Sequence, residues 1–360
     1  MAHETSKSSH LERTAKEPRN QSLHTVLVGD INQINDTVRI LRLDIPWEST
    51  PIRFLPGQWL DVYVPGVEKA GGFTITSLPQ QALLPHPAEK DAAGPKEQEQ
   101  EQAEKNVKEK GPFLELAIQK SPGNPPAAWL WAPNATSIVG QELRVRIGGS
   151  FVWPPPGINV RTGLRRVVFV AGGVGVNALV PMLCAHAHAA STKSLTATAG
   201  GTNLEVHFLY SLKDPGSRKA SQMLFVDRIA RVFQHDSVKG DFQLFLTGGG
   251  SGDGHKNEHG EGQEGESANT DTSSEIERAG AVVGDNVVTT TTGDIPFQAR
   301  RCTIKDVAEA IGPPTERRFA VVYVCGIPTM TDDFVAKLTA RTEAGGLGME
   351  PHRVLCEKWW

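Results

Sequence analysis

Cysteine is scarce in this sequence, and the few cysteines are not spaced as metal ligands usually are. The 360 residues contain four cysteines, and no two of them form a C-x-x-C pair. This spacing argues against a zinc site, a protein-bound iron–sulfur cluster and a disulfide framework. We therefore expect no metal site and a reducing compartment.

Long apolar runs are missing, and neither sign of charge dominates. No segment reaches the roughly 18 consecutive apolar residues that a membrane-spanning helix needs. Lys and Arg number 37 against 41 Asp and Glu, so the formal net charge is −4. This balance gives no reason to expect binding to nucleic acid or to an anionic membrane surface. The composition predicts a soluble protein.

The N-terminal residues lack the charge pattern of a mitochondrial presequence. Residues 1–22 contain basic residues and serines, but also Glu4, Glu12 and Glu17, which such presequences usually avoid. We interpret residues 1–22 as a flexible lead-in. The compartment, mitochondrial or cytoplasmic, stays open.

Two stretches contain few apolar residues and interrupt the rest of the chain. In residues 88–110, 12 of 23 residues are charged, and residues 248–294 are rich in Gly, Ser, Thr, Glu and Asp. Neither can bury enough apolar surface to offset the entropy lost on ordering. We predict solvated insertions without a function, and we interpret the i, i+4 pair His255 and His259 as loop residues rather than metal ligands.

The first half of the chain has the pattern of a small β-barrel. Between residues 23 and 156, short segments of alternating apolar and polar residues are separated by Pro and Gly, as is typical of antiparallel strands. The expected strands are residues 24–28, 37–43, 58–64, 113–119 and 142–147. The proline run at residues 154–156 marks the end of this domain.

The second half, residues 160–360, alternates between strand and helix. Expected strands are residues 167–171, 205–210, 242–246, 319–324 and 353–357, and expected helices are residues 179–183, 222–233, 304–311 and 330–344. This order predicts a parallel sheet with helices on both faces. Ligands bind such a sheet beyond the carboxyl ends of its strands.

A glycine-rich turn follows the first of these strands. Gly172, Gly173 and Gly175 lead into an apolar helix that starts near Val176. Glycines let backbone N–H groups approach a phosphate, and the helix adds the positive end of its dipole. The alternative is a tight strand–helix connection without a ligand, because such a glycine cluster alone is a weak signal.

Three further segments support the interpretation of the glycine-rich turn as a ligand site. Residues 321–330 form an apolar strand that ends in Cys-Gly-x-Pro-x-Met, the chain ends in Glu-Lys-Trp-Trp, and residues 72–77 read Gly-Phe-Thr-Ile-Thr-Ser. In this order the motifs resemble the ferredoxin–NADP reductase-like flavoprotein family, and most closely its oxidoreductase NAD-binding domain-containing proteins. The resemblance covers residues 24–360 apart from the insertions. It implies an antiparallel β-barrel FAD-binding domain followed by an α/β Rossmann-like NAD(P)-binding domain.

The resemblance implies a flavin site on the barrel. Phe73 would stack on the flavin, the Thr74 hydroxyl would lie near flavin N5, and the amides of Ile75, Thr76 and Ser77 would help to hold the phosphate. The family has an arginine for this phosphate where the present chain has Gly71. A second phosphate contact would come from Gly123. The alternative is an ordinary strand after a Gly-Gly turn.

The resemblance also implies a nicotinamide site on the second domain. Gly172, Gly173, Gly175 and Val176 would face the pyrophosphate, and Ser211, Lys213, Asp214 and Arg218 would lie near the adenosine ribose. Asp214 favours the 2′-hydroxyl of NADH, whereas Lys213 and Arg218 favour the 2′-phosphate of NADPH. We lean towards NADH.

The hydride-transfer residues would come from the ends of two strands. Cys325 would lie against the nicotinamide, flanked by Gly326, Pro328 and Met330, although a buried core thiol is the alternative. Trp359, with Trp360 beyond it, would cover the flavin, and Glu357 would relay a proton. The expected catalytic residues are therefore Thr74, Cys325, Glu357 and Trp359.

Together these features predict a flavin-dependent NAD(P)H oxidoreductase. It would pass hydride from nicotinamide to FAD and electrons on to an unidentified acceptor, with a redox protein among the candidates. One alternative is an NAD(P)-binding regulatory or interaction protein that has lost its flavin. Another is the reductase component of a multi-protein electron-transfer system.

Overall fold

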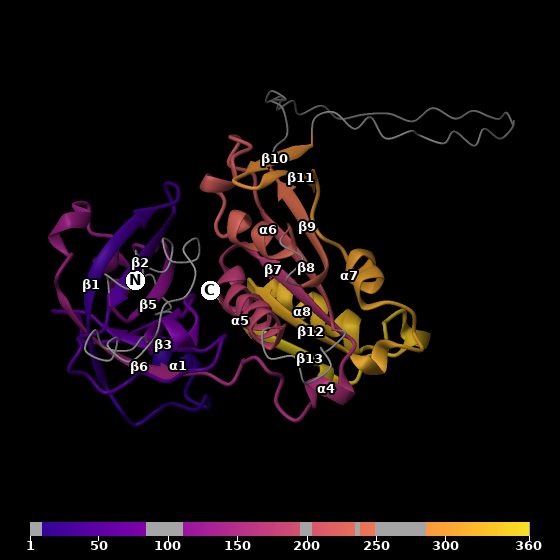
Figure 1. The fold of residues 1–360 in the computed structure, drawn as a ribbon, viewed down its shortest axis with the longest axis horizontal. Helices are drawn as coiled ribbons and strands as arrows, with labels where there is room; N and C mark the ends of the chain where they lie inside the picture. The colour runs from indigo at the N-terminus through magenta and orange to yellow at the C-terminus, as the bar shows by residue number, and fades with distance from the viewer. Residues whose placement is uncertain (1–8, 84–110, 195–203, 235–237, 249–285, 360) are drawn as a thin grey trace, which may run out of the picture.

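The chain forms two lobes, which Figure 1 shows side by side. The computed structural model describes residues 9–83, 111–194, 204–234, 238–248 and 286–359. The insertion at residues 88–110, most of the one at residues 248–294 with its two histidines, and Trp360 lie outside the described residues. Within the described ranges, no helix is both long and apolar enough to cross a membrane.

The first lobe is an antiparallel barrel. Its six-stranded sheet has the order β4-β3-β6-β1-β2-β5. A bridge between Ile75 and Leu116 joins the end of β4 to β5 and closes the sheet. The strands are β1 (His24–Gln33), β2 (Val38–Asp44), β3 (Trp59–Tyr63), β4 (Gly71–Thr74), β5 (Phe113–Gln119) and β6 (Glu142–Gly148). The predicted barrel is therefore confirmed.

Residues 9–22 are packed on the barrel, so the prediction of a flexible N-terminal segment over residues 1–22 is wrong for them. They contain helix α1 (His10–Arg13) and pack on the barrel, with His10 buried. The reason is Asp61 of β3, a fully buried carboxylate that needs charged partners. His10 Nε2 and Arg19 Nε each lie 3.0 Å from its oxygens, and Arg146 Nη2 of β6 donates at 2.7 Å. The N-terminal segment thus supplies two of the three partners.

The second lobe is a doubly wound α/β domain. Its seven-stranded sheet has the order β10-β11-β9-β8-β7-β12-β13. All neighbouring pairs are parallel except β10 and β11. The strands are β7 (Arg166–Gly172), β8 (Glu205–Lys213), β9 (Lys239–Thr247), β10 (Val287–Thr290), β11 (Gly293–Gln298), β12 (Ala320–Gly326) and β13 (Val354–Lys358). The strand order reverses between β7 and β12, which is where such sheets bind ligands.

Helices cover both faces of this sheet, as the alternating pattern predicted. Val167, Phe169 and Ala171 of β7 face α5 and α6, whereas Val168 and Val170 face α7 and α8. A strand buried on both faces therefore has to be apolar throughout. The helices are α3 (Pro125–Leu130) on the barrel, then α4 (Val160–Gly163), α5 (Val176–Ser194), α6 (Val226–Gln234), α7 (Ile304–Ile311) and α8 (Pro328–Thr339).

The second predicted insertion ends earlier than expected, because a β-hairpin occupies its C-terminal end. Residues 287–294 were assigned to it, yet they form β10 and the start of β11. The apolar side chain of Val288 is fully buried in the core of the second lobe. This strand was not predicted because its short alternating segment directly follows a long polar stretch.

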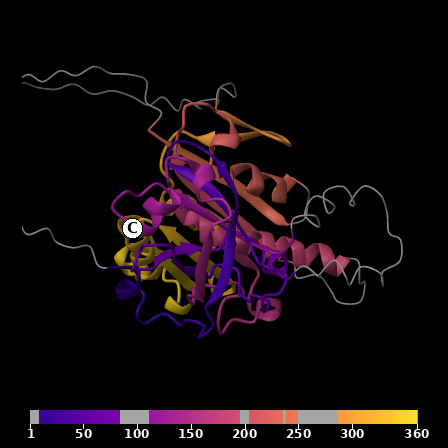
Figure 2. The same cartoon turned by 90° about the vertical axis from the view of Figure 1, so that its left-hand side faces the viewer.

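Buried polar contacts join the two lobes, and Figure 2 shows the barrel in front of the α/β domain. Tyr323 Oη donates to the Val152 carbonyl at 2.9 Å. Arg228 of α6 forms a bidentate ion pair with Glu115 of β5, at 2.8 and 3.0 Å. These contacts hold the carboxyl ends of the parallel strands against the barrel.

Candidate functional site

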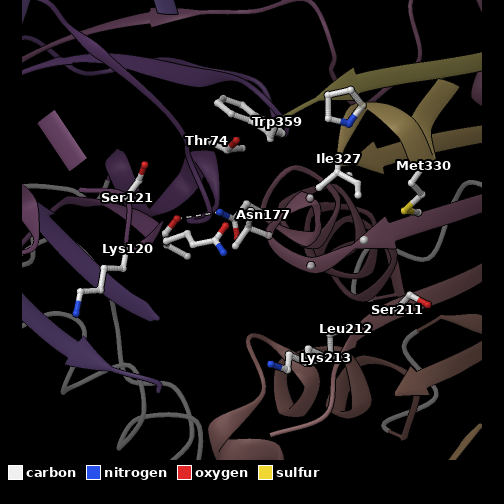
Figure 3. Close-up of a pocket in the computed structure, with 18 of the residues that line it drawn as sticks. Thr74, Lys120, Ser121, Asn177, Ser211, Leu212, Lys213, Ile327, Met330 and Trp359 are labelled. Carbon is white, nitrogen blue, oxygen red and sulfur yellow. Dashed lines mark hydrogen bonds between the residues drawn. The ribbon is translucent and has the colours of Figure 1, made fainter. Parts of the chain in front are cut away.

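A cavity of about 530 Å³ lies between the two lobes, at the carboxyl ends of β7, β8 and β12. Residues from both domains line it, and Figure 3 shows ten of them with labels. Among the residues predicted from the sequence, those on its wall are Phe73, Thr74, Gly172, Gly173, Gly175, Ser211, Lys213, Gly326, Pro328, Met330 and Trp359.

The glycine turn forms one wall of the cavity. A Cβ on Gly175 would lie 2.2 Å from the Cys325 carbonyl oxygen, and one on Gly172 would lie 2.4 Å from Met330 Sδ. Gly173 has a φ of +53° and open space around it. Here β7 and β12 come together, and the turn opens onto the cavity just before α5 begins at Val176. Exposed amides at a helix start form an anion site.

The barrel supplies the opposite wall. Phe73 and Thr74 are nearly buried, and both contribute to the cavity surface. Trp359 approaches this wall from the end of β13, and Figure 3 shows it on the same side of the cavity as Thr74. The Trp359 backbone N–H donates to the Gly326 carbonyl at 3.1 Å, and its Nε1 donates to Glu357 Oε2 at 3.1 Å. The indole is therefore held at two points.

Cys325 and Glu357 lie opposite each other on β12 and β13. The Cys325 thiol is fully buried and does not line the cavity, and burial, with the Glu357 charge, raises its pKa well above the ordinary value. Burial also raises the pKa of Glu357 to about 8, against the hydrogen bond from Trp359, which lowers it. A carboxyl group with a pKa near neutrality is suited to proton transfer.

Charged residues mark the far end of the cavity. Lys213 is on the wall, but Asp214 is not, because it forms an ion pair with Arg218 at 2.7 Å. Arg301 and Cys302 also line this end, and the Cys302 N–H donates to Ser211 Oγ at 3.1 Å. Neither Arg301 nor Cys302 was among the site residues predicted from the sequence. They follow the second insertion and belong to no motif, so no sequence signal pointed to them.

Several residues predicted to bind the flavin have contacts elsewhere. Ile75, Thr76 and Ser77 are buried. Thr76 Oγ1 donates to Glu115 Oε1 at 2.7 Å, and Ser77 Oγ accepts from the Glu115 N–H at 3.1 Å. The amides that were predicted to hold the phosphate are engaged as well, because the Ile75 N–H donates to the Gln58 carbonyl at 3.0 Å and the Thr76 N–H to the Glu115 carbonyl at 2.8 Å. Val176 is likewise fully buried, within the core under α5.

The turn at residues 120–126 has two sides. Lys120, Ser121 and Asn124 line the main cavity, although the sequence analysis singled out Gly123 from this turn. Gly123 instead faces a second cavity of about 890 Å³, which Ser121 and Asn124 also line. The two cavities therefore meet over one turn.

Gly71 leaves no room for the arginine that the family has at this position. A Cβ there would lie 2.6 Å from Phe73 Cε2 and 2.8 Å from Pro126 Cβ. Helix α3 thus closes the space into which a longer side chain would project. Asn177, which the sequence analysis also missed, ties the two walls together, because its Nδ2 donates to the Ala117 carbonyl at 2.8 Å.

An antiparallel barrel, a doubly wound α/β domain and a cavity between them define a class. The chain has the two-domain fold of the ferredoxin–NADP reductase-like flavoproteins, as its motifs predicted. The FAD/NAD-binding domain of Vibrio cholerae nitric oxide dioxygenase superposes with a TM-score of 0.54 at 14% identity, over 93% of this chain and 98% of that one. A Neisseria gonorrhoeae ferredoxin NADP+ reductase with bound FAD and NADP gives 0.52 at 12% identity, over 94% and 99%.

Sequence comparison gives nearer relatives. The protein named Oxidoreductase NAD-binding domain-containing protein 1 from Danio rerio is 28% identical over 356 residues, 98% of each chain. The Homo sapiens protein of that name is 26% identical over 356 residues, 98% of this chain and 85% of that one. No family model matches the chain. The resemblance stated from the motifs is confirmed by these full-length relatives and by the fold.

Proposed function

We propose that the protein is an FAD-dependent NAD(P)H oxidoreductase. The observation that carries this proposal is one cavity that joins the glycine turn at residues 172–175 to the aromatic barrel wall around Phe73. The shared name of the curated relatives and the FAD and NADP bound in the Neisseria gonorrhoeae structure give it further support.

The glycine turn would hold the dinucleotide pyrophosphate. The open backbone around Gly173 can approach two phosphates, and the start of α5 contributes positive charge. Gly326, Pro328 and Met330 border the cavity where the nicotinamide would lie. Gly326 has no side chain, so a flat ring can approach the backbone there.

The barrel wall would hold the flavin ring. Phe73 and Thr74 would border it on one side, and Trp359 would cover the side that the nicotinamide has to reach. When both groups are bound, the nicotinamide supplies a hydride and the flavin accepts it. Trp359 would have to move aside for this, while its backbone hydrogen bond to Gly326 keeps it at the end of β12.

The flavin diphosphate needs positive charge that Gly71 does not provide. Lys120 is on the wall of the main cavity, and Arg13 and Lys69 are on the wall of the second cavity. We propose that the ring lies in the main cavity and that the diphosphate crosses the turn at Ser121 and Asn124. Gly123 would then contact the adenosine half of the molecule, in the second cavity.

Glu357 would hold and release a proton near the ring. Its raised pKa leaves most of the carboxyl groups protonated at neutral pH, and its hydrogen bond with Trp359 couples it to the covering indole. Cys325, fully buried behind Gly326, would shape the floor under the nicotinamide rather than react.

The test is a visible absorption spectrum of the purified full chain before and after anaerobic addition of NADPH and, separately, NADH. We expect a flavin spectrum that bleaches with at least one of them. Trp359→Ala should change both the spectrum and the nicotinamide affinity. Trp47→Ala is the matched control, because Trp47 is 41% exposed and is not on the cavity wall.

A colourless protein that added FAD cannot reconstitute would overturn the proposal. If that protein still binds NADPH or NADH, the second candidate takes its place: an NAD(P)-binding regulatory or interaction protein that has lost its flavin. The closed space beyond Gly71 is the observation that favours this candidate. If the flavin bleaches but no small oxidant reoxidises it efficiently, a redox protein becomes the expected acceptor.

A further inference from the structure

We infer that the far end of the cavity selects a dinucleotide with a 2′-phosphate, NADPH, over NADH. Lys213 and Arg301 would be the specificity-determining residues. The inference rests on the proposed binding of a nicotinamide dinucleotide. It replaces the lean towards NADH that Asp214 had suggested in the sequence.

Asp214 is already engaged within the protein. Its Oδ2 lies 2.7 Å from Arg218 Nη1, and its Oδ1 accepts from the Gly216 N–H at 2.8 Å. Its side chain is 3% exposed and is absent from the cavity wall. Arg218 is itself held in place, with its guanidinium 4.3 Å from the centre of the Phe297 ring. Recognition of a ribose 2′-hydroxyl needs an accessible carboxylate, and this one is covered.

Two other cations remain at the same end. Lys213 and Arg301 both line the cavity and are exposed. Within the described ranges, neither side chain has an ion-pair or hydrogen-bond partner. The arginine nearest to each of them in sequence is paired instead: Arg300 forms an ion pair with Asp306 at 2.6 Å, and Arg218 forms one with Asp214. Figure 3 shows the Lys213 side chain extending into the space between the lobes.

Backbone contacts hold the two cations at one place. The hydrogen bond from the Cys302 N–H to Ser211 Oγ fixes the segment that follows β11 against the end of β8. Lys213 pairs with Thr247 across β8 and β9, and the Asp214 N–H donates to the Thr247 carbonyl at 2.9 Å. Both segments are therefore anchored, and only the cationic side chains are left to meet a ligand.

This arrangement distinguishes the two dinucleotides by charge. A 2′-phosphate carries up to two negative charges and accepts charge-assisted hydrogen bonds from both side chains. A 2′-hydroxyl neither neutralises them nor gains a carboxylate partner from Asp214.

The experiment measures binding of 2′,5′-ADP and of 5′-AMP to the full chain by calorimetry. These probes differ in the 2′-phosphate and need no flavin. We expect 2′,5′-ADP to bind on the order of tenfold more tightly or better. Lys213→Ala and Arg301→Ala should each weaken 2′,5′-ADP binding by about tenfold and leave 5′-AMP binding nearly unchanged. Lys305→Ala is the matched control, an exposed lysine nearby that does not line the cavity.

The outcomes separate this inference from the proposed function. Equal affinity for the two probes, or variants that lose both probes equally, overturns the selectivity and leaves the oxidoreductase proposal standing. If neither probe binds and neither NADPH nor NADH binds, nucleotide binding fails altogether, and both proposals fall. A thermal melt of each variant checks that it is folded.

Discussion

Two pairs of glycines lie on the cavity wall or next to it, in opposite domains, and they are there for different reasons. On the α/β side, a Cβ on Gly175 would meet the backbone of β12, and one on Gly172 would meet Met330. On the barrel side, a Cβ on Gly72 would lie 2.1 Å from His10 Cε1, and one on Gly71 would meet Phe73 and Pro126.

The difference lies in what each pair makes room for. The α/β glycines bring the ends of two parallel strands together so that the turn between them opens onto a ligand space. The barrel glycines admit side chains of the protein itself, from the N-terminal segment and from α3. The missing side chain would meet strand backbone at Gly175 but other side chains of the protein at Gly172, Gly71 and Gly72. Within the turn at residues 172–175, Gly173 is the glycine whose missing side chain would project into open space.

The largest expected effect is that of Gly175→Ala. Its neighbour is the Cys325 carbonyl, a backbone group that cannot turn away, so we expect a loss of about 3 kcal/mol in the free energy of unfolding. Nucleotide binding should also be lost, as measured by calorimetry with NADPH. Gly173→Ala is the matched control for stability alone, because a Cβ there meets no atom within 4 Å and only its φ of +53° is unfavourable. Equal losses in the two variants would contradict the backbone contact.

Gly71→Arg tests the barrel glycines by restoring the family's arginine. We expect about 2 kcal/mol of destabilisation from the contacts with Phe73 and Pro126, and no gain in FAD affinity. A fluorescence titration with FAD and a denaturant unfolding curve measure the two quantities. Gly123→Arg is the control for the unfolding curve alone, since a Cβ at Gly123 meets nothing within 4 Å. Tighter FAD binding by the Gly71 variant would show that the space is open after all.

His10→Ala tests the contact that Gly72 admits. The variant removes one partner of the buried Asp61 and the edge-on contact with Trp59, whose ring centre is 4.7 Å away. Because Arg19 and Arg146 remain, we expect a loss of about 1.5 kcal/mol in the free energy of unfolding of the barrel. NADPH affinity should be unchanged. Lys16→Ala, at an exposed position of the same segment, should have no effect. An unchanged stability in His10→Ala would mean that the N-terminal segment does not pack on the barrel in solution.

Glu357→Gln has an effect that is smallest in acid and grows as the pH is raised. The pKa of Glu357 is raised from 4.5 to about 8, so the folded chain holds a proton that the unfolded chain releases. Stability from this group is complete below pH 4.5 and is lost as the pH rises towards 8. The glutamine variant should therefore gain thermal stability relative to the wild type as the pH is raised, and turnover should lose a titration near pH 8. Parallel melting curves in both proteins would refute the raised pKa.

Sequence patterns alone predicted the two domains and the order of their elements. Period-two alternation specifies which face of each barrel strand is buried, and uninterrupted apolar strands such as β7 specify a sheet covered on both faces. The sequence also located the turn at residues 172–175 and the two strand ends that flank the cavity. These signals are local, because each depends on residues within one element or its adjoining turn.

Which side chains surround those elements depends on contacts between residues far apart in the chain, and the folded structure was needed to show them. Residues 9–22 lie on the barrel because the buried carboxylate of Asp61, far along the chain, needs the hydrogen bonds of His10 and Arg19. The fold removes Asp214 from the cavity by pairing it with Arg218, and it brings Arg301 to the wall beside Lys213. Burial and charge pairing join residues that are distant in sequence. A motif can therefore name the strand end where a ligand binds, but not which side chains there are left free to meet it.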